Sequence, residues 1–164
     1  MLDYISWFKN FPPELATILI AMLPIAELRA ALPIALTVYK LPLTVAFFWS
    51  VVGNMLPIVI LVWFIRPLFL FLSKHSKLAD QFFSWWFNRV HYKFEKGALK
   101  YGINIALVIF VAIPLPLTGA WSGAVASFLF GISPRRALIL ILFGVIIAGI
   151  IVALLTQGGV YVLK

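Results

Sequence analysis

The sequence predicts an all-α integral membrane protein: an inverted repeat of a re-entrant helical hairpin plus a transmembrane helix, with amphipathic interfacial helices. Hydrophobic residues make up 64% of the chain and charged residues 11%, against about 45–50% and about 25% in soluble domains. The mean hydropathy is +1.10. Two of the long apolar runs, at 15–39 and 103–131, each contain a pair of prolines near their centre. The length of 164 residues suits a single membrane domain, residues 1–164.

The charge balance is strongly basic, with 13 Lys and Arg against 5 Asp and Glu, for a net charge of +8. Most of these bases flank apolar segments, so we expect membrane lipids with anionic headgroups, and no nucleic acid, as partners. The chain has no cysteine, which excludes disulfides and thiol chemistry. His75 and His91 lack a second ligand at metal spacing. Without a nucleophile–base set, we expect neither a cofactor nor an enzyme.

The first repeat covers about residues 15–65. Before it, residues 1–14 carry aromatic side chains typical of a short helix at the membrane interface. An apolar, proline-broken segment follows at 15–39, and then an apolar run at 43–65. A run of that length spans a hydrocarbon core of about 30 Å at about 1.5 Å per residue.

The linker at 66–101 separates the repeats and contains seven bases against two acids. Its larger apolar residues recur at four-residue spacing: Leu78, Phe82, Trp86, Val90 and Phe94. This pattern predicts an amphipathic helix lying in the interface. The basic excess predicts a cytoplasmic linker in a multi-pass protein of the plasma (inner) membrane.

The second repeat, about 103–157, has the same order of parts as the first: a proline-broken segment at 103–131, a short joint and a final apolar run at 137–155. If each broken segment returns to its own side, the two repeats begin on opposite sides of the membrane. Transporters often have this inverted arrangement, with the site at the repeat interface near the midplane.

The positive-inside rule supports this topology over four plain crossings. With two re-entrant hairpins, the basic linker and Arg135-Arg136 share one side, with Lys40 and Lys164 opposite. With four crossings, Arg135-Arg136 would face outside, and the excess of basic residues on the cytoplasmic side would be smaller. The charges favour two hairpins and two full spans.

Glu27 is the only acid in the apolar segment at 15–39. A charge at mid-membrane costs about 2.5–3.5 kcal/mol, so Glu27 is expected to face protein or water. Burial favours the protonated form of a carboxyl group, and we interpret Glu27 as a proton or cation site. The alternative is a structural partner of Arg29 or of the hairpin-tip backbone.

Arg29 is interpreted as an anion ligand, because its planar guanidinium suits phosphate and carboxylate. Two residues after Glu27, it would not face that acid on a regular helix. The alternative is an arginine that extends to the interface. Pro24 and Pro33 flank the pair and suggest a broken backbone on each side.

The second broken segment centres on Pro114, Pro116, Thr118 and Gly119. We interpret it as a hairpin tip whose backbone groups line a cavity and favour an anion; the alternative is a packed kink. Trp121 could gate or stack on substrate, or be a core or interface tryptophan.

Two further features have alternative interpretations. Arg135 and Arg136 could bind a lipid phosphate, or only orient the last span. The small-residue stripe Gly119, Gly123 and Ser127 predicts close helix packing, and Asn54 predicts an interhelical hydrogen bond before a pathway role.

The motifs ELR at 27–29 with Pro33, and PLPLTGAWSG at 114–123, resemble the small multidrug export family of prokaryotic membrane proteins. The resemblance covers about residues 15–155. That family is distantly similar to the DedA/VTT superfamily, which pairs two re-entrant hairpins with spans and includes polyprenyl-phosphate translocases and lipid scramblases. The resemblance implies transport. The longer arginine motif of DedA proteins has no match in the second half of this chain.

We therefore expect a small transporter, a proton-coupled translocase of a lipid-linked or other anionic substrate, with Glu27 taking the proton and Arg29 the anion. The alternatives are a cationic drug exporter and a non-transporting scaffold or lipid-binding subunit. Because the spans are few, we expect a homo-oligomer, in the simplest case a dimer.

Overall fold

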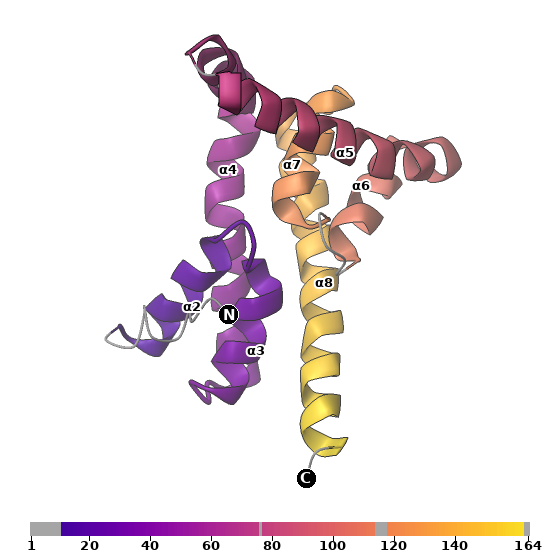
Figure 1. Ribbon diagram of the computed structural model, residues 1–164. Coiled ribbons are helices and arrows are strands. Elements are labelled where there is room, and N and C mark those ends of the chain that lie inside the picture. The colour runs from indigo at the N-terminus through magenta and orange to yellow at the C-terminus, as the bar shows by residue number, and fades with distance from the viewer. Residues whose placement is uncertain (1–10, 76, 114–117, 163–164) are drawn as a thin grey trace. The chain divides into compact units, whose positions relative to one another are not determined.

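The computed structural model describes residues 11–75, 77–113 and 118–162, which form helices and no strand (Figure 1). The helices are α2 (Pro13–Met22), α3 (Glu27–Thr37), α4 (Leu43–His75), α5 (Lys77–Tyr101), α6 (Ile103–Ala112), α7 (Ala120–Leu129) and α8 (Pro134–Val162). They group into two compact units, Met1–Pro57 with Val145–Lys164, and Ile58–Gly144. Helices α4 and α8 each contribute to both units.

In the first unit, α2 and α3 pack against each other as a hairpin. Pro13 begins α2, where its missing N–H costs no hydrogen bond. The residues at the centre of the contact are mostly small: Ile20, Ala21, Ala26 and Ala31. Small side chains let two helix backbones approach closely, which is how helices associate in an apolar solvent.

The first half of α4 packs on this hairpin through Gly53. A Cβ at Gly53 would lie 2.6 Å from the carbonyl oxygen of Ile18 and 2.8 Å from its Cα. The backbones of α4 and α2 are therefore in direct contact. On α8, a Cβ at Gly149 would lie 2.7 Å from Phe47 and 3.4 Å from Leu28, so α3, α4 and α8 converge there.

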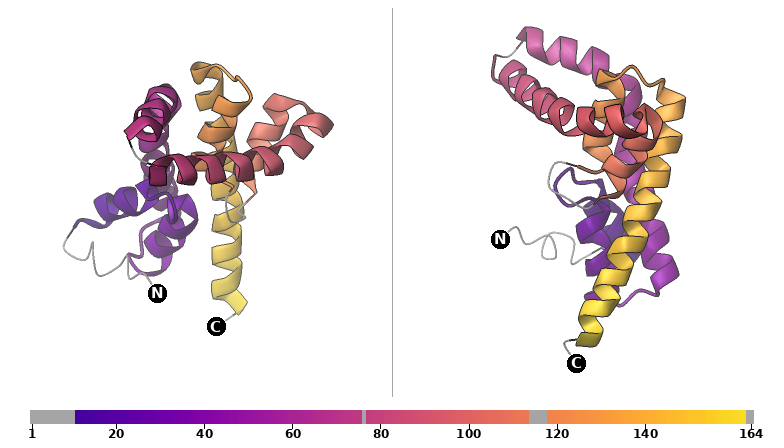
Figure 2. Two further views of the ribbon diagram at one scale, coloured as in Figure 1. Left: turned by 45° about the horizontal axis from the view of Figure 1, so that its top comes forward. Right: turned by 90° about the vertical axis from the view of Figure 1, so that its right-hand side faces the viewer.

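In the second unit, α5 crosses α7 at a steep angle, as Figure 1 and the left view of Figure 2 show. Val90 and Phe94 on α5 are fully buried. Phe94 contacts Phe130 and Phe110 with ring centroids 4.6 and 5.6 Å apart. Leu78, the first residue of the predicted apolar stripe, is 80% exposed. The stripe thus covers α6 and α7 with its C-terminal half only.

Val111 of α6 lies between two glycines of the second unit. A Cβ at Gly123 on α7 would come within 2.6 Å of its side chain, and so would a Cβ at Gly144 on α8. The prediction that the small-residue stripe serves close helix packing is confirmed at Gly123.

Among the described residues, two helical stretches are long and apolar enough to cross a membrane: Leu43–Ile65, with 23 residues, and Pro134–Gly159, with 26. They agree with the two apolar runs predicted to span, 43–65 and 137–155, and are candidate spans by length and composition. The apolar helices α2, α6 and α7 have 10 residues each, or about 15 Å at 1.5 Å per residue. That is about half of a hydrocarbon core of roughly 30 Å.

The predicted end of the first span at 65 agrees with the candidate span Leu43–Ile65. The linker at 66–101 is two helical segments, the end of α4 at 66–75 and α5 from Lys77, and the prediction of a proline on each side of the break is wrong. Pro33 does not flank a break, because it lies inside α3; the turn between the helices lies on the Pro24 side alone. The interfacial helix predicted at 1–14 falls largely outside the described residues.

Candidate functional site

Glu27 is the first residue of α3, with a left-handed backbone conformation. Its φ is +49°, whereas α-helices have φ near −63°. Its N–H donates to the carbonyl oxygen of Leu23 at 2.9 Å, which closes the turn that begins at Pro24. A left-handed residue other than glycine costs about 1–2 kcal/mol. The hairpin therefore holds Glu27 in a strained conformation, with only 5% of the residue exposed.

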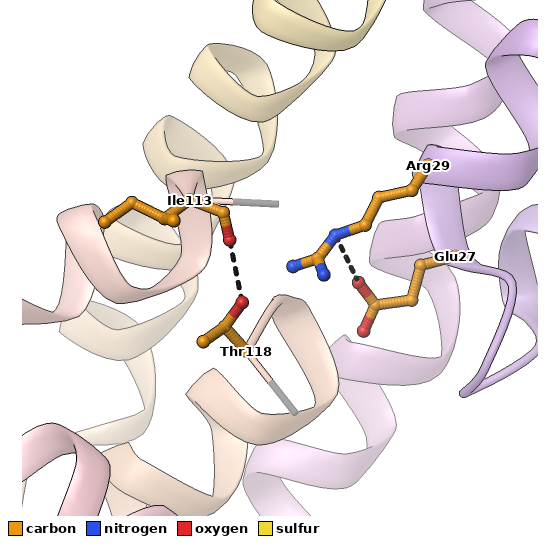
Figure 3. Close-up of polar contacts among 4 residues, drawn as sticks. All are labelled: Glu27, Arg29, Ile113 and Thr118. Carbon is orange, nitrogen blue, oxygen red and sulfur yellow. Dashed lines mark hydrogen bonds and ion pairs between the residues drawn. The ribbon is translucent and has the colours of Figure 1, made fainter. Parts of the chain in front are cut away.

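This backbone conformation brings Glu27 and Arg29 together. The guanidinium Nε of Arg29 lies 3.9 Å from Oε2 of Glu27, an ion pair drawn in Figure 3. Residues at this spacing do not face each other on a regular helix, and they meet here because the backbone of Glu27 departs from one. The Arg29 side chain is 22% exposed and that of Glu27 is 6% exposed. A buried carboxylate and a more accessible guanidinium thus share one site.

Two buried polar side chains of α4 belong to the same unit. Ser50 is fully buried and Asn54 is 2% exposed. Ser50 Oγ and Asn54 Oδ1 have no hydrogen-bond partner among the described residues. Since residues four apart share one face of a helix, they form a single polar stretch in the first span. The interhelical hydrogen bond predicted for Asn54 is not seen at its Oδ1 atom. The sequence analysis did not single out Ser50, although a polar residue four positions before Asn54 indicates a shared helix face.

Elsewhere, buried hydroxyls bond to their own helix. Thr17 Oγ1 donates to the carbonyl oxygen of Pro13, and Ser127 Oγ to that of Ala124, each at 2.7 Å. A buried polar group left without a partner costs about 1–3 kcal/mol. Ser50 departs from this pattern, because its buried hydroxyl has no partner among the described residues.

In the second unit, Thr118 joins the two ends of the α6–α7 connection. Its Oγ1 donates to the carbonyl oxygen of Ile113 at 2.7 Å, as Figure 3 shows. Gly119 follows with φ +105° and ψ −172°, a conformation that essentially only glycine adopts. The hydrogen bond of Thr118 and the backbone conformation of Gly119 therefore explain why these residue types occur here. Pro114 and Pro116, the other predicted residues of this tip, lie outside the described residues.

The remaining predicted residues are placed as follows. Trp121 is half-buried in the first turn of α7. Arg135 and Arg136 are exposed in the first turn of α8, in the same unit as the basic α5. Exposure keeps both guanidinium groups available to an anionic headgroup, and it equally suits orientation of the span.

The two histidines lie near a backbone carbonyl and a carboxylate of their own helices. His75 Nδ1 lies 2.7 Å from the carbonyl oxygen of Phe71, and His91 Nδ1 lies 3.8 Å from Oε2 of Glu95. Among residues 11–75, 77–113 and 118–162, no three His, Asp or Glu side chains gather in one place.

The comparisons with known proteins give one match. No curated protein and no solved structure matches the chain. A family model described as "Putative small multi-drug export protein" matches residues 27–151. The match begins at Glu27 and includes both long apolar helices for most of their length. Its description is that of an exporter and not of an enzyme. The chain therefore belongs to this family of small multi-drug export proteins.

Proposed function

We propose that the chain is a small membrane transporter in which Glu27 and Arg29 form the substrate and coupling site. The observation that carries the proposal is the Glu27–Arg29 ion pair, built on a strained left-handed residue within an apolar hairpin. Intramembrane ionisable residues are functional by default, because their insertion is costly. Strained residues likewise cluster at functional sites.

In this proposal Glu27 exchanges a proton and Arg29 holds an anionic group of the substrate, such as the phosphate of a lipid-linked compound. Protonation of Glu27 would weaken the 3.9 Å ion pair and release the guanidinium toward an anion. Deprotonation would restore the pair and expel the anion. The buried, unpartnered oxygens of Ser50 and Asn54 support a polar path in the same unit.

The membrane topology that goes with this function has two re-entrant hairpins, α2–α3 and α6–α7, each followed by a full span. The short lengths of α2, α6 and α7 support this topology, and so does the twofold order of short helix, short helix, long helix. We propose that the two halves are inverted repeats within one domain of the plasma membrane, with the basic α5 in the cytoplasm.

The direct test is transport by purified protein in liposomes that contain a fluorescent polyprenyl phosphate. We expect Glu27→Gln to abolish the dependence of flux on a pH gradient, and Arg29→Ala to lower flux about ten-fold, a loss of about 1.4 kcal/mol of binding. Glu14→Gln and Lys40→Ala are matched controls outside the ion pair. Unchanged flux in both Glu27→Gln and Arg29→Ala would refute the assigned roles.

A second candidate is export of drugs, which the description of the family names, in the form of cationic compounds. Glu27 would then be the counter-ion of the substrate, and Arg29 would oppose binding because like charges repel. The two functions predict opposite effects: Arg29→Ala should raise the flux of a cationic dye such as ethidium, but lower that of a phosphate-bearing lipid.

The non-transporting alternative is a scaffold or lipid-binding subunit. Substrate movement by purified protein alone would exclude it. The homodimer expected from the few spans is checked by the mass of the protein in detergent, measured with light scattering at several protein concentrations.

A further inference from the structure

Helix α5 borders two adjacent cavities in the second unit. One, of about 340 Å³, lies between α5 and α6 and is mostly apolar, with Phe94, Ala106, Ile109 and Phe110 among its lining residues. The other, of about 450 Å³, is an open hollow over one face of α5, lined by the exposed residues Trp85, Asn88, Arg89, Tyr92 and Lys93. Lys93 lines both cavities. The volume of the first falls in the range of small-molecule sites, about 300–1,000 Å³.

The order of the lining residues along α5 gives the pair of cavities a polar and an apolar end. Residues three, four, seven and eight apart share one face of a helix. Trp85, Arg89 and Lys93 follow one another at four-residue spacing, and Gly97 and Tyr101 continue the row into the apolar cavity. The character of the row changes at Lys93, from cationic and aromatic to apolar.

The charge of the unit favours an anion at the polar end. Residues 58–144 contain nine Lys and Arg but only two acids, Asp80 and Glu95. Glu95 lies 3.8 Å from His91, and neither acid lines the polar cavity. Tryptophan and tyrosine beside these cations are typical of headgroup depth in a membrane.

We propose that the two cavities form one binding site for an anionic phospholipid. Arg89 and Lys93 would bind the phosphate, with Trp85 and Tyr92 beside the headgroup. An acyl chain would lie between α5 and α6 against Phe94, Ile109 and Phe110. A free phosphate would use only the polar end, whereas a phospholipid accounts for both ends. The site lies apart from Glu27 and Arg29 in the sequence and does not rest on the proposed transport.

The test is lipid retention by the full chain, measured with native mass spectrometry after incubation with phosphatidylglycerol or phosphatidylcholine of equal chain length. The wild type should bind phosphatidylglycerol about ten-fold more tightly, as expected for charge-assisted contacts. The double variant Arg89→Gln/Lys93→Gln should lose that preference. The control Lys74→Gln/Lys77→Gln, with the same change in charge outside both cavities, should keep it.

The apolar end has its own test. A Cβ at Gly97 would lie 3.6 Å from that of Ala106, an ordinary contact. Gly97→Ala should therefore leave binding unchanged, while the larger Gly97→Leu should fill the cavity and weaken lipid binding. On the wild type, lysophosphatidylglycerol of increasing chain length should bind with increasing affinity, and inorganic phosphate should not displace it. Equal binding of both headgroups, equal loss in the control, or affinity independent of chain length would overturn the proposal.

Discussion

At the scale of single residues, Glu27 combines burial, charge and a left-handed backbone. The sequence marked it as an acid in an apolar, proline-broken segment, and on a regular helix Glu27 and Arg29 would point apart. The structure places the irregular backbone at the acid itself. The ion pair with Arg29 is a consequence of that irregularity.

Glycine normally destabilises a helix, but at the strained position Glu27 we expect it to stabilise the protein relative to glutamine. Because glycine adopts positive φ freely, Glu27→Gly should be more stable than Glu27→Gln by about 1 kcal/mol. At Glu14, which lies in the first turn of α2, glycine should be less stable than glutamine. The measurement is the midpoint of thermal unfolding in detergent. A lower midpoint for Glu27→Gly than for Glu27→Gln would contradict the left-handed assignment.

Ser50 gives a second prediction at this scale. Since its hydroxyl has no partner among the described residues, Ser50→Ala should leave stability unchanged or raise it by up to about 1 kcal/mol. The matched control is Ser127→Ala, which removes a bonded hydroxyl and should cost about 1 kcal/mol. If Ser50 belongs to a polar path, transport should fall although the midpoint of unfolding does not. Normal transport by Ser50→Ala would remove it from the path.

At the scale of elements, the apolar runs and the prolines were sufficient to predict where helices lie. The predicted span at 43–65 coincides with the candidate span Leu43–Ile65. Helix ends were less predictable. Pro33 remains inside α3, although it cannot donate to the carbonyl oxygen of Arg29. The helix α4 continues past the span to His75, because residues 68–72 are all Leu or Phe and Phe69 packs on Phe83 and Phe87 of α5.

Contact between α4 and α2 is tested at Gly53. Gly53→Ala should lower the free energy of unfolding by about 1–3 kcal/mol, because its Cβ would meet the backbone of Ile18. Gly158 of α8 has nothing within 4 Å of an added Cβ, and Gly158→Ala should be neutral or stabilising by about 1 kcal/mol. Thermal unfolding in detergent measures both. If Gly53→Ala is tolerated as well as Gly158→Ala, the two helix backbones do not touch.

At the scale of the whole molecule, the order of elements repeats: two short helices and then a long one, in each half. This repetition agrees with the order of parts seen in the sequence. The inverted relation of the halves, the meeting of the two broken segments and the single domain stay predictions, since they concern the placement of the two units in a membrane.

The absence of cysteine makes the topology directly testable. Single cysteines at Lys40, Lys77 and Ser133 can be labelled in whole cells with a membrane-impermeant maleimide. Two re-entrant hairpins predict labelling of Lys40→Cys from outside and of the other two only after permeabilisation. Four plain crossings would instead expose Ser133→Cys to the outside, together with Lys40→Cys.

The sequence by itself determined the membrane class, the two candidate spans, the family and the candidate pair Glu27 and Arg29, because hydropathy, proline and a costly buried charge are properties of short stretches of chain. Only the tertiary structure decided the left-handed turn at Glu27, the bond from Thr118 to Ile113, the unpartnered oxygens of α4 and the cavities along α5. These depend on which backbones come into contact, and contact between distant segments is fixed by packing and not by local preference.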